Sequence, residues 1–236
     1  MDRTEKICLV TGASSGIGYA VAKALSHDNH KIIATARRAE RLNQLKKDSV
    51  DVLAGDLNST DFQDSIEDFI YSTYGRCDYL FNCAGTAQVG SIEEMDIEKM
   101  TSMLRLNIES TFRLTYNMLK RFKKQGSGHV INISSILGTK VRSTAGAYAA
   151  TKYALEALSE ALRMELAGSN IQVTCIEPGL VMTELHKDWK IHPKDSMGIH
   201  MPLQVEDIVE AVRFIMKQPA HVRIPRLMIL PKDQNM

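Results

Sequence analysis

Short apolar runs rich in β-branched residues alternate along the chain with longer segments whose apolar residues recur at helical spacing. The short runs predict strands and the longer segments predict amphipathic helices. We expect strands at 6–10, 31–36, 50–54, 78–82, 128–133, 171–177 and 226–230. We expect helices at 17–27, 39–47, 61–74, 97–125, 147–167 and 205–218.

This alternation of strands and helices is typical of βαβ units, which build a parallel sheet covered by helices on both faces. The predicted strands are nearly continuous apolar runs, as a sheet buried on both faces requires. No internal repeat, low-complexity tract or Pro/Gly-rich linker divides the chain. The pattern therefore predicts an α/β fold, a doubly wound parallel sheet of seven strands, in one domain spanning residues 1–236.

The segment 181–203 breaks this regular pattern. It carries Trp189 and three histidines, His186, His192 and His200, without clear periodicity. A long irregular connection in a compact domain is typical of a functional lid or binding loop, so we expect a substrate loop here. The histidines lack the close spacing of metal ligands, and no metal is expected. The lysines of this segment, Lys187, Lys190 and Lys194, are interpreted as solvated.

The composition is that of a soluble globular protein. Of the 236 residues, 44% are hydrophobic and 24% are charged, and the formal net charge is +1. This balance speaks against a nucleic-acid or membrane surface. No apolar run reaches the roughly 18–20 residues that a spanning helix needs, and the charged start does not resemble a signal peptide. Cys8 and Cys175 lie in predicted strands and are expected to be buried free thiols, so we expect a cytoplasmic protein.

The sequence TGASSGIG follows directly after the first predicted strand. Gly12 permits a tight turn, Gly16 lets the backbone approach a pyrophosphate, and Gly18 lets the next helix pack closely on the strand. The N-terminus of that helix offers free N–H groups and a partial positive charge. A plain strand-to-helix turn is the alternative, but the position favours a dinucleotide phosphate site made by Gly12, Ser14, Ser15, Gly16, Ile17 and Gly18.

The second predicted strand ends at Ala36, and two arginines, Arg37 and Arg38, follow it. A carboxylate at this position would bind ribose hydroxyls and repel a phosphate, whereas guanidinium groups suit a phosphate. We therefore predict NADP(H) as the cofactor, with its 2′-phosphate on Arg37 and Arg38. One charge-assisted hydrogen bond stabilises by roughly 1.5–3 kcal/mol, which is about a tenfold to hundredfold preference. The alternative is a solvated helix start, and this is our interpretation of Arg41.

Tyr148 and Lys152 lie one turn apart on a predicted helix. A tyrosine, with an ordinary pKa near 10, can act as an acid or base near neutral pH only if its phenolate is stabilised, and a neighbouring ammonium does this. The pair alone is a weak signal. Ser134 and Ser135 end a strand at the edge where open α/β sheets bind ligands, and Asn107 interrupts an apolar helical segment.

Taken in order, these motifs resemble the short-chain dehydrogenase/reductase family in its single-domain form, with a Rossmann-type fold. The resemblance runs from Lys6 to the C-terminus. It includes the motifs at 11–18, 55–57 (GDL), 82–85 (NCAG) and 178–183 (PGLVMT), together with Asn107, Ser135, Tyr148 and Lys152.

The resemblance implies a role for each of these residues. Tyr148 would exchange a proton with the substrate oxygen, and Ser135 would orient that oxygen. Lys152 would lower the pKa of the tyrosine and hold the nicotinamide ribose, while Asn107 would anchor a water of a proton relay. The implied cofactor contacts are Asp56 and Leu57 at the adenine, then Asn82, Cys83, Ala84 and Gly85, and at the nicotinamide end Pro178, Gly179, Val181 and Thr183.

Two positions depart from the family pattern. Cys83 stands where a second asparagine or an alanine is common, which we expect to matter little because small size and backbone are what count there. Ser15 stands where many NADP-dependent members carry a basic residue, so the 2′-phosphate would rest on Arg37 and Arg38 alone.

The sequences LPKDQ, ATARRAERL and IEPGLV are similar to those of NADP-dependent 3-hydroxy acid (serine-type) dehydrogenases. This similarity implies oxidation of a primary or secondary alcohol, such as a small 3-hydroxy acid. A reductase of 3-oxoacyl thioesters, ketones or aldehydes is an alternative, and an NADP(H)-binding regulator without catalysis is another. The family also implies a homotetramer, or else a homodimer, assembled through the helices of Asn107 and Tyr148. Neither a membrane nor a nucleic acid is an expected partner.

Overall fold

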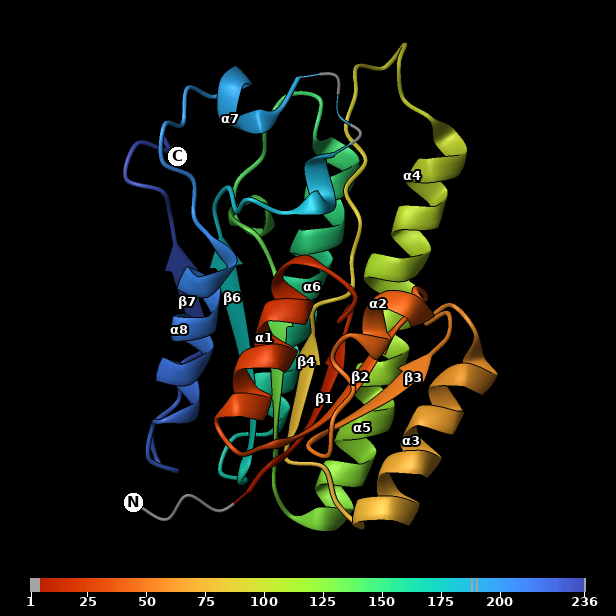
Figure 1. Ribbon diagram of the computed structural model, residues 1–236. Coiled ribbons are helices and arrows are strands. Elements are labelled where there is room, and N and C mark those ends of the chain that lie inside the picture. Colours follow the sequence, from red (N-terminus) through yellow and green to blue (C-terminus); the bar gives the residue numbers. More distant parts are fainter. Residues whose placement is uncertain (1–4, 188, 190, 236) are drawn as a thin grey trace.

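The structure, a computed structural model, describes residues 5–187, 189 and 191–235. Its centre is a sheet of seven parallel strands in the order β3-β2-β1-β4-β5-β6-β7 (Figure 1). The order reverses between β1 and β4, which is where open α/β sheets form a ligand crevice. The strands are β1 (Ile7–Thr11), β2 (Lys31–Ala36), β3 (Val50–Ala54), β4 (Tyr79–Asn82), β5 (Gly128–Ile133), β6 (Ile171–Pro178) and β7 (Arg226–Ile229).

Helices cover both faces of the sheet. Within β1, Cys8 and Val10 face one apolar layer, whereas Ile7 and Leu9 face the other. The first layer is completed by α1 (Gly16–His27), α2 (Ala39–Asn43) and α8 (Val205–Met216), and the second by α3 (Thr60–Tyr74), α5 (Thr111–Gln125) and α6 (Gly146–Glu165). The doubly wound α/β architecture predicted from the sequence is confirmed.

Two predicted helices differ from the observed ones. The helix expected at 39–47 ends at Asn43, because the chain turns back at Lys47, whose carbonyl accepts a hydrogen bond from Val50 N at 2.8 Å. The helix expected at 97–125 is continuous but contains a π-helical turn. It consists of α4 (Ile97–Leu104), the π-turn η1 (Arg105–Ser110) and α5.

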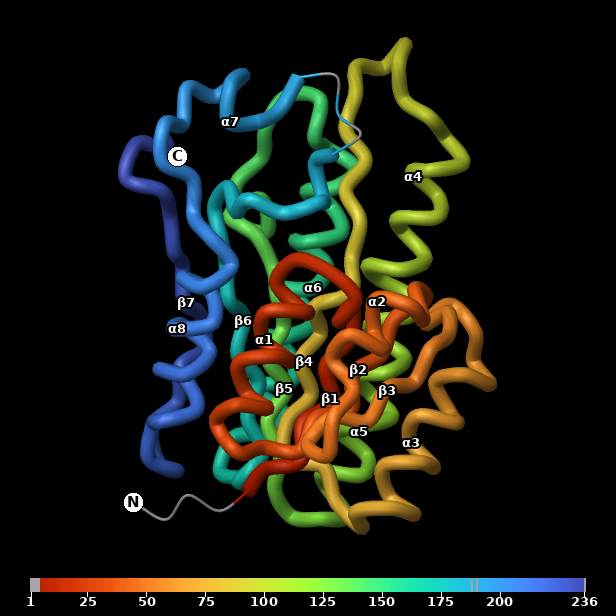
Figure 2. The backbone as a smooth tube through the Cα atoms, in the orientation of Figure 1, coloured from red at the N-terminus to blue at the C-terminus, as the bar shows by residue number. Residues whose placement is uncertain are grey.

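The longest connections rise above the carboxyl edge of the sheet (Figure 1). The largest runs from β6 through the short helices η3 (Glu184–His186) and α7 (Pro193–Ser196) to α8, and Figure 2 shows it as a long blue excursion. Its two ends are joined at the base, because Leu203 N donates to Leu180 O at 2.9 Å and Met182 N donates to Leu203 O at 2.8 Å. The segment 181–203 is therefore a closed loop on the edge where ligands bind.

The C-terminal tail braces this loop from outside. Gln234 Oε1 accepts a hydrogen bond from Leu180 N at 2.8 Å, and Asp233 Oδ2 accepts one from His200 N at 2.7 Å. The tail thus contacts the loop near both of its ends.

All four cysteines are free thiols, and Cys8, Cys77 and Cys175 are buried. The prediction for Cys8 and Cys175 is confirmed. Within the described part of the chain, no helix is both long and apolar enough to cross a membrane.

Candidate active site

A cleft of about 640 Å³ lies along the carboxyl edge of the sheet, above the point where the strand order reverses. This volume is typical of small-molecule sites. The cleft is lined by the loops that follow the strands from β1 to β6. Of the residues predicted to contact a cofactor, it brings together Gly12, Ser14, Ser15, Gly16, Ile17, Gly18, Arg37, Arg38, Asp56, Leu57, Cys83, Ala84, Gly85, Tyr148, Lys152, Pro178, Gly179, Val181 and Thr183.

The loop between β1 and α1 has the close approaches expected of a phosphate loop. Gly12 has φ +66°, and a Cβ there would lie 2.8 Å from the backbone of Ala84. A Cβ at Gly18 would lie 2.6 Å from Gly12 O, so the helix packs tightly on the turn. The N-cap residue of α1, Ser15, makes no side-chain cap bond, and the first turn carries no acidic residue. The start of α1 therefore fits a pyrophosphate well.

Thr11 ties this loop to the neighbouring strand. Its Oγ1 donates to Phe81 O at 3.2 Å and accepts from Cys83 N and Ala84 N, each at 3.0 Å. The hydroxyl thus fixes the segment after β4 beside the phosphate loop, and this contact holds two walls of the cleft in register.

Ser135, Tyr148 and Lys152 come together in the same cleft. Lys152 Nζ donates to Ile133 O at 2.8 Å and lies 5.8 Å from the centre of the Tyr148 ring. Ser135 lies two residues beyond the end of β5, and the other two residues lie one turn apart on α6. This arrangement brings two hydroxyl groups, those of Ser135 and Tyr148, close to one cation.

Burial dominates the acid–base behaviour of this group. It raises the pKa of Tyr148 to about 12, although the hydrogen bond with Ser135 works in the opposite direction. Burial also lowers the pKa of Lys152 to about 8, against the opposing influence of Cys175, Cys83 and Glu156. Because one pKa unit corresponds to about 1.4 kcal/mol, Tyr148 depends strongly on nearby positive charge to act near neutral pH.

Asn107 lies in the π-turn η1, buried behind the cleft. Its Oδ1 accepts from Thr86 N at 3.0 Å, and its Nδ2 donates to Thr86 O at 2.9 Å and to Thr151 Oγ1 at 3.2 Å. A Cβ at Gly85 would lie 3.3 Å from Asn107 Oδ1 and 4.0 Å from Lys152 Nζ. The amide therefore fixes the loop after β4 close to Lys152. Its predicted role in holding a water stays a prediction.

Asn82, predicted to line the cofactor, is buried beneath the cleft. Its Nδ2 donates to Thr115 Oγ1 at 2.9 Å and to Asn132 Oδ1 at 2.8 Å, and Asn132 Nδ2 donates to Ser159 Oγ at 2.9 Å. These bonds join β4 and β5 to the helices α5 and α6. The contact of Asn82 with a cofactor stays a prediction.

The arginines after β2 have unequal surroundings. Arg38 Nε donates to Ser14 Oγ at 3.1 Å, Nη2 donates to Ser15 Oγ, and Nη1 pairs with Glu184 Oε2 at 2.9 Å. Arg41 Nη1 pairs with the other carboxylate oxygen of Glu184. Arg41 is exposed, in agreement with its interpretation as part of a solvated helix start, but the loop after β6 also brings an acidic partner to it. Arg37 is exposed at the rim of the cleft.

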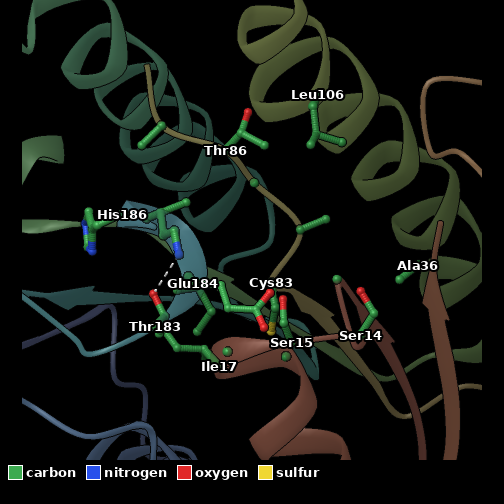
Figure 3. A pocket seen from close by; sticks show the side chains of 18 of the residues that line it. Ser14, Ser15, Ile17, Ala36, Cys83, Thr86, Leu106, Thr183, Glu184 and His186 are labelled. Atoms are coloured by element: carbon green, nitrogen blue, oxygen red, sulfur yellow. Dashed lines mark hydrogen bonds between the residues drawn. The ribbon is translucent and has the colours of Figure 1, made fainter. Parts of the chain in front are cut away.

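The loop 181–203 also contributes residues that the sequence did not single out for the site, among them Glu184 and His186 (Figure 3). Hydrogen bonds from Arg38 and Arg41 lower the pKa of Glu184 to about 2, so its carboxylate is charged at neutral pH. Burial lowers the pKa of His186 to about 4, so its imidazole is neutral. Of the lysines in this loop, Lys187 reaches the rim of the cleft, Lys194 is exposed, and Lys190 lies outside the described residues.

Arg142 belongs to the connection between Ser135 and Tyr148. Its Nη1 contacts Met197 Sδ, and it has no acidic partner among the residues that the structure describes. Its charge contributes to the lowered pKa of His186, which places the guanidinium in the neighbourhood of that imidazole. A half-buried cation thus lies near His186, which lines the cleft.

Comparison with known proteins agrees with this geometry. A family model described as short chain dehydrogenase matches residues 6–194. An uncharacterised oxidoreductase of Staphylococcus aureus (strain MW2) is 34% identical over 232 residues, covering 97% of this chain and 98% of the relative.

Two solved structures are especially similar. One is the closed form of a serine dehydrogenase complexed with NADP+, with 32% identity, a TM-score of 0.89, and coverage of 98% of this chain and 96% of the other. The second is a serine dehydrogenase from Escherichia coli, with 32% identity, a TM-score of 0.84, and coverage of 98% and 100%.

Proposed function

Since the chain belongs to the short-chain dehydrogenase family, we propose that it is an NADP(H)-dependent oxidoreductase that interconverts an alcohol and a carbonyl. The observation that carries this proposal is the convergence of Ser135, Tyr148 and Lys152 in one cleft with the phosphate loop. All the predicted catalytic positions are filled, which disfavours a regulator without catalysis.

The bound nicotinamide supplies the acceptor or donor of a hydride. In the oxidative direction, Tyr148 accepts the proton of the substrate hydroxyl, and Ser135 hydrogen-bonds the substrate oxygen and orients it. Lys152, behind the ring of Tyr148, stabilises the phenolate before that step. In the reductive direction Tyr148 donates the proton to the carbonyl oxygen.

We propose a preference for NADP(H) over NAD(H) from the residues at the end of the cleft that lies next to β2. Arg37 and Arg38 supply positive charge directly after β2, and the strand itself ends in Ala36 where a carboxylate would bind ribose hydroxyls. The similar serine dehydrogenase structure is a complex with NADP+. Asp56 and Leu57 would lie at the adenine, and Pro178 and Thr183 at the nicotinamide.

We propose a small 3-hydroxy acid as the substrate. Two serine dehydrogenase structures have sequences 32% identical to the chain over nearly its whole length. In addition, Arg142 offers a guanidinium without an acidic partner, within the described residues, beside the loop 181–203. A carboxylate is the natural partner of such a group, whereas a neutral ketone or aldehyde is not.

The test is NADP+ reduction, followed by absorbance, with L-serine, L-allo-threonine and 3-hydroxyisobutyrate, and with NAD+ in parallel. We expect turnover that prefers NADP+ and is abolished by Tyr148→Phe. If all three acids are inert while NADPH is consumed by a ketone or a 3-oxoacyl thioester, the mechanism holds but the substrate proposal fails. Preference for NAD+ would contradict the role given to the two arginines.

We further propose a cytoplasmic homotetramer, with a homodimer as the alternative. Tyr116 on α5 and Tyr153 on α6 are 46% and 41% exposed, so the two helices carry aromatic side chains that a partner subunit could cover. The free thiols are compatible with a reducing compartment. Light scattering of the purified protein measures the assembly directly, and a monomer would contradict it.

A further inference from the structure

Glu184 joins two separate walls of the cleft. It belongs to η3, directly after Thr183, and its carboxylate reaches Arg38 and Arg41, which follow β2. Arg38 in turn bonds Ser14 and Ser15 of the phosphate loop. In Figure 3 the side chain of Glu184 lies over the start of α1 beside Ser15. We call these bonds, from the two serines through Arg38 and Glu184 to Arg41, the arginine bridge.

Every side-chain nitrogen of Arg38 has a partner in this bridge. Nε, Nη1 and Nη2 donate to Ser14, Glu184 and Ser15. Both carboxylate oxygens of Glu184 are also used. Three of the five N–H groups of Arg38 are used in this way. A phosphate that takes the Nη1 hydrogen now bonded to Glu184 must therefore replace that carboxylate.

The exchange of one anion for another is favourable here. The side chains of Arg38, Arg41 and Glu184 are 41%, 44% and 39% exposed, and ion pairs at such exposure stabilise only weakly. A phosphate carries up to two negative charges and three acceptor oxygens, against one charge and two oxygens for a carboxylate. The carboxylate of Glu184 is therefore a weakly bound anion at the place where the proposed function requires the 2′-phosphate of the cofactor.

We propose that Glu184 occupies the Arg38 side of the 2′-phosphate position proposed for Arg37 and Arg38, and that a 2′-phosphate displaces it from Arg38 and Arg41 and releases the start of the loop 181–203. The proposal rests on the proposed use of NADP(H). Because NAD(H) has only a hydroxyl at this position, it leaves the arginine bridge intact. Glu184 is then a specificity-determining residue that couples recognition of the 2′-phosphate to the loop over the substrate.

The chain has an intrinsic reporter for this release. Trp189 is its single tryptophan, five residues after Glu184. Its ring lies edge-on to the imidazole of His186, with 4.8 Å between the ring centres. His186 is the last residue of the short helix that begins at Glu184. Movement of Glu184 therefore changes the surroundings of the tryptophan, and its fluorescence follows the loop.

The experiment compares 2′,5′-ADP with 5′-AMP, which share the adenosine but differ in the 2′-phosphate. Binding is measured by calorimetry and by Trp189 fluorescence in the wild type, in Glu184→Gln, and in Glu206→Gln, which removes an exposed carboxylate of α8. In the wild type and in the control, only 2′,5′-ADP should change the fluorescence. In Glu184→Gln we expect 2′,5′-ADP to bind about three- to tenfold more tightly, 5′-AMP to bind within about twofold of wild type, and the fluorescence change to be lost.

The possible outcomes distinguish failure of the displacement of Glu184 from failure of the proposed use of NADP(H). If 2′,5′-ADP binds wild type no better than 5′-AMP, the proposed use of NADP(H) fails. If it binds better but Glu184→Gln weakens both ligands alike, Glu184 closes over any dinucleotide and the displacement is refuted. An unchanged selectivity in Glu184→Gln also refutes it.

Discussion

Tyr148 is held in surroundings that oppose its own ionisation. Burial raises its pKa to about 12, and Lys152, whose Nζ lies 5.8 Å from the centre of the ring, has its own pKa lowered by burial to about 8. The two side chains therefore act as one unit, in which loss of the cation leaves the phenol without support.

We expect Lys152→Met to reduce kcat/KM for alcohol oxidation at neutral pH by about a hundredfold or more. The remaining activity should rise further into alkaline pH than in wild type, because without the ammonium the pKa of Tyr148 is higher. The pH profile of kcat/KM measures this. Lys120→Met, an exposed change on α5, is the control. A profile lowered uniformly, without a shift to higher pH, would contradict the electrostatic role.

A second prediction about a single residue concerns Arg142 and the carboxylate of the proposed substrate. Arg142→Met keeps a long side chain but removes the cation, so KM for a 3-hydroxy acid should rise about tenfold or more while kcat changes less. KM for the matching neutral alcohol should not change. Lys140→Met removes a charge from the same connection at an exposed position and should leave both constants unaltered. If KM rises equally for the acid and the neutral alcohol, Arg142 does not bind the carboxylate.

The sequence revealed some of these residues and concealed others for a physical reason. Gly12, Gly18 and the pair Tyr148 and Lys152 are fixed by short-range geometry, so their spacing is visible in the chain. The contacts of Glu184 with Arg38 and Arg41 join residues 146 and 143 positions apart. Nothing local distinguishes this glutamate from other loop carboxylates, and only the fold brings the partners together.

Among the elements, η1 shows what periodicity does not detect. The helical pattern from 97 to 125 was predicted correctly as one continuous helix, but the wider π-turn inside it was not. Such turns are frequent at functional sites. Here the turn contains Asn107, whose amide exchanges two hydrogen bonds with the backbone of Thr86. The polar residue in an apolar helix was the visible sign of this distortion.

The connection before α6 contains a strained residue. Thr144 has φ +65°, an unfavourable conformation for a β-branched side chain, and its carbonyl accepts a hydrogen bond from Gly90 N at 2.9 Å. The strain therefore belongs to the segment that joins Ser135 to Tyr148.

Thr144→Gly should relieve this strain and raise the free energy of unfolding, by up to about 1 kcal/mol once the greater entropy of glycine in the unfolded chain is included. Asn29, with φ +64°, is the matched control, because asparagine tolerates this conformation and Asn29→Gly should change stability less. Urea unfolding measures both. A loss of stability in Thr144→Gly would show that contacts of the threonine side chain stabilise the fold by more than its backbone strain destabilises it.

For the whole molecule, the order of strands and helices was predictable because each run is long and its period is clear. The layers follow from the alternation of side chains in strands such as β1, where Cys8 and Leu9 face opposite helices. The ends of elements were less predictable where tertiary contacts decide them, as at Lys47, which turns the chain back into β3.

Global stability should depend on pH through a buried histidine. His129 in β5 is 6% exposed and lies 2.8 Å from Thr174 Oγ1, and burial lowers its pKa to about 3. Between pH 6.5 and 3 the unfolded chain binds a proton here that the folded chain does not. The free energy of unfolding therefore decreases as the pH is lowered through this window.

At pH 5 the loss from His129 is about 2 kcal/mol relative to neutral pH, a large part of a typical total of about 5–15 kcal/mol. We expect His129→Gln to lose correspondingly less stability between pH 7 and pH 5 than wild type, as measured by urea unfolding at both pH values. The exposed His221→Gln should behave like wild type. An unchanged pH dependence in His129→Gln would mean that His129 is protonated in the folded protein.

The contacts of the C-terminal tail make the geometry of the cleft depend on residues outside it. Asp233 and Gln234 hold the two ends of the loop that covers the cleft. Neither residue lines the cleft itself. A substitution that loosens Asp233 or Gln234 therefore also loosens the loop over the cleft, and it changes the site from outside.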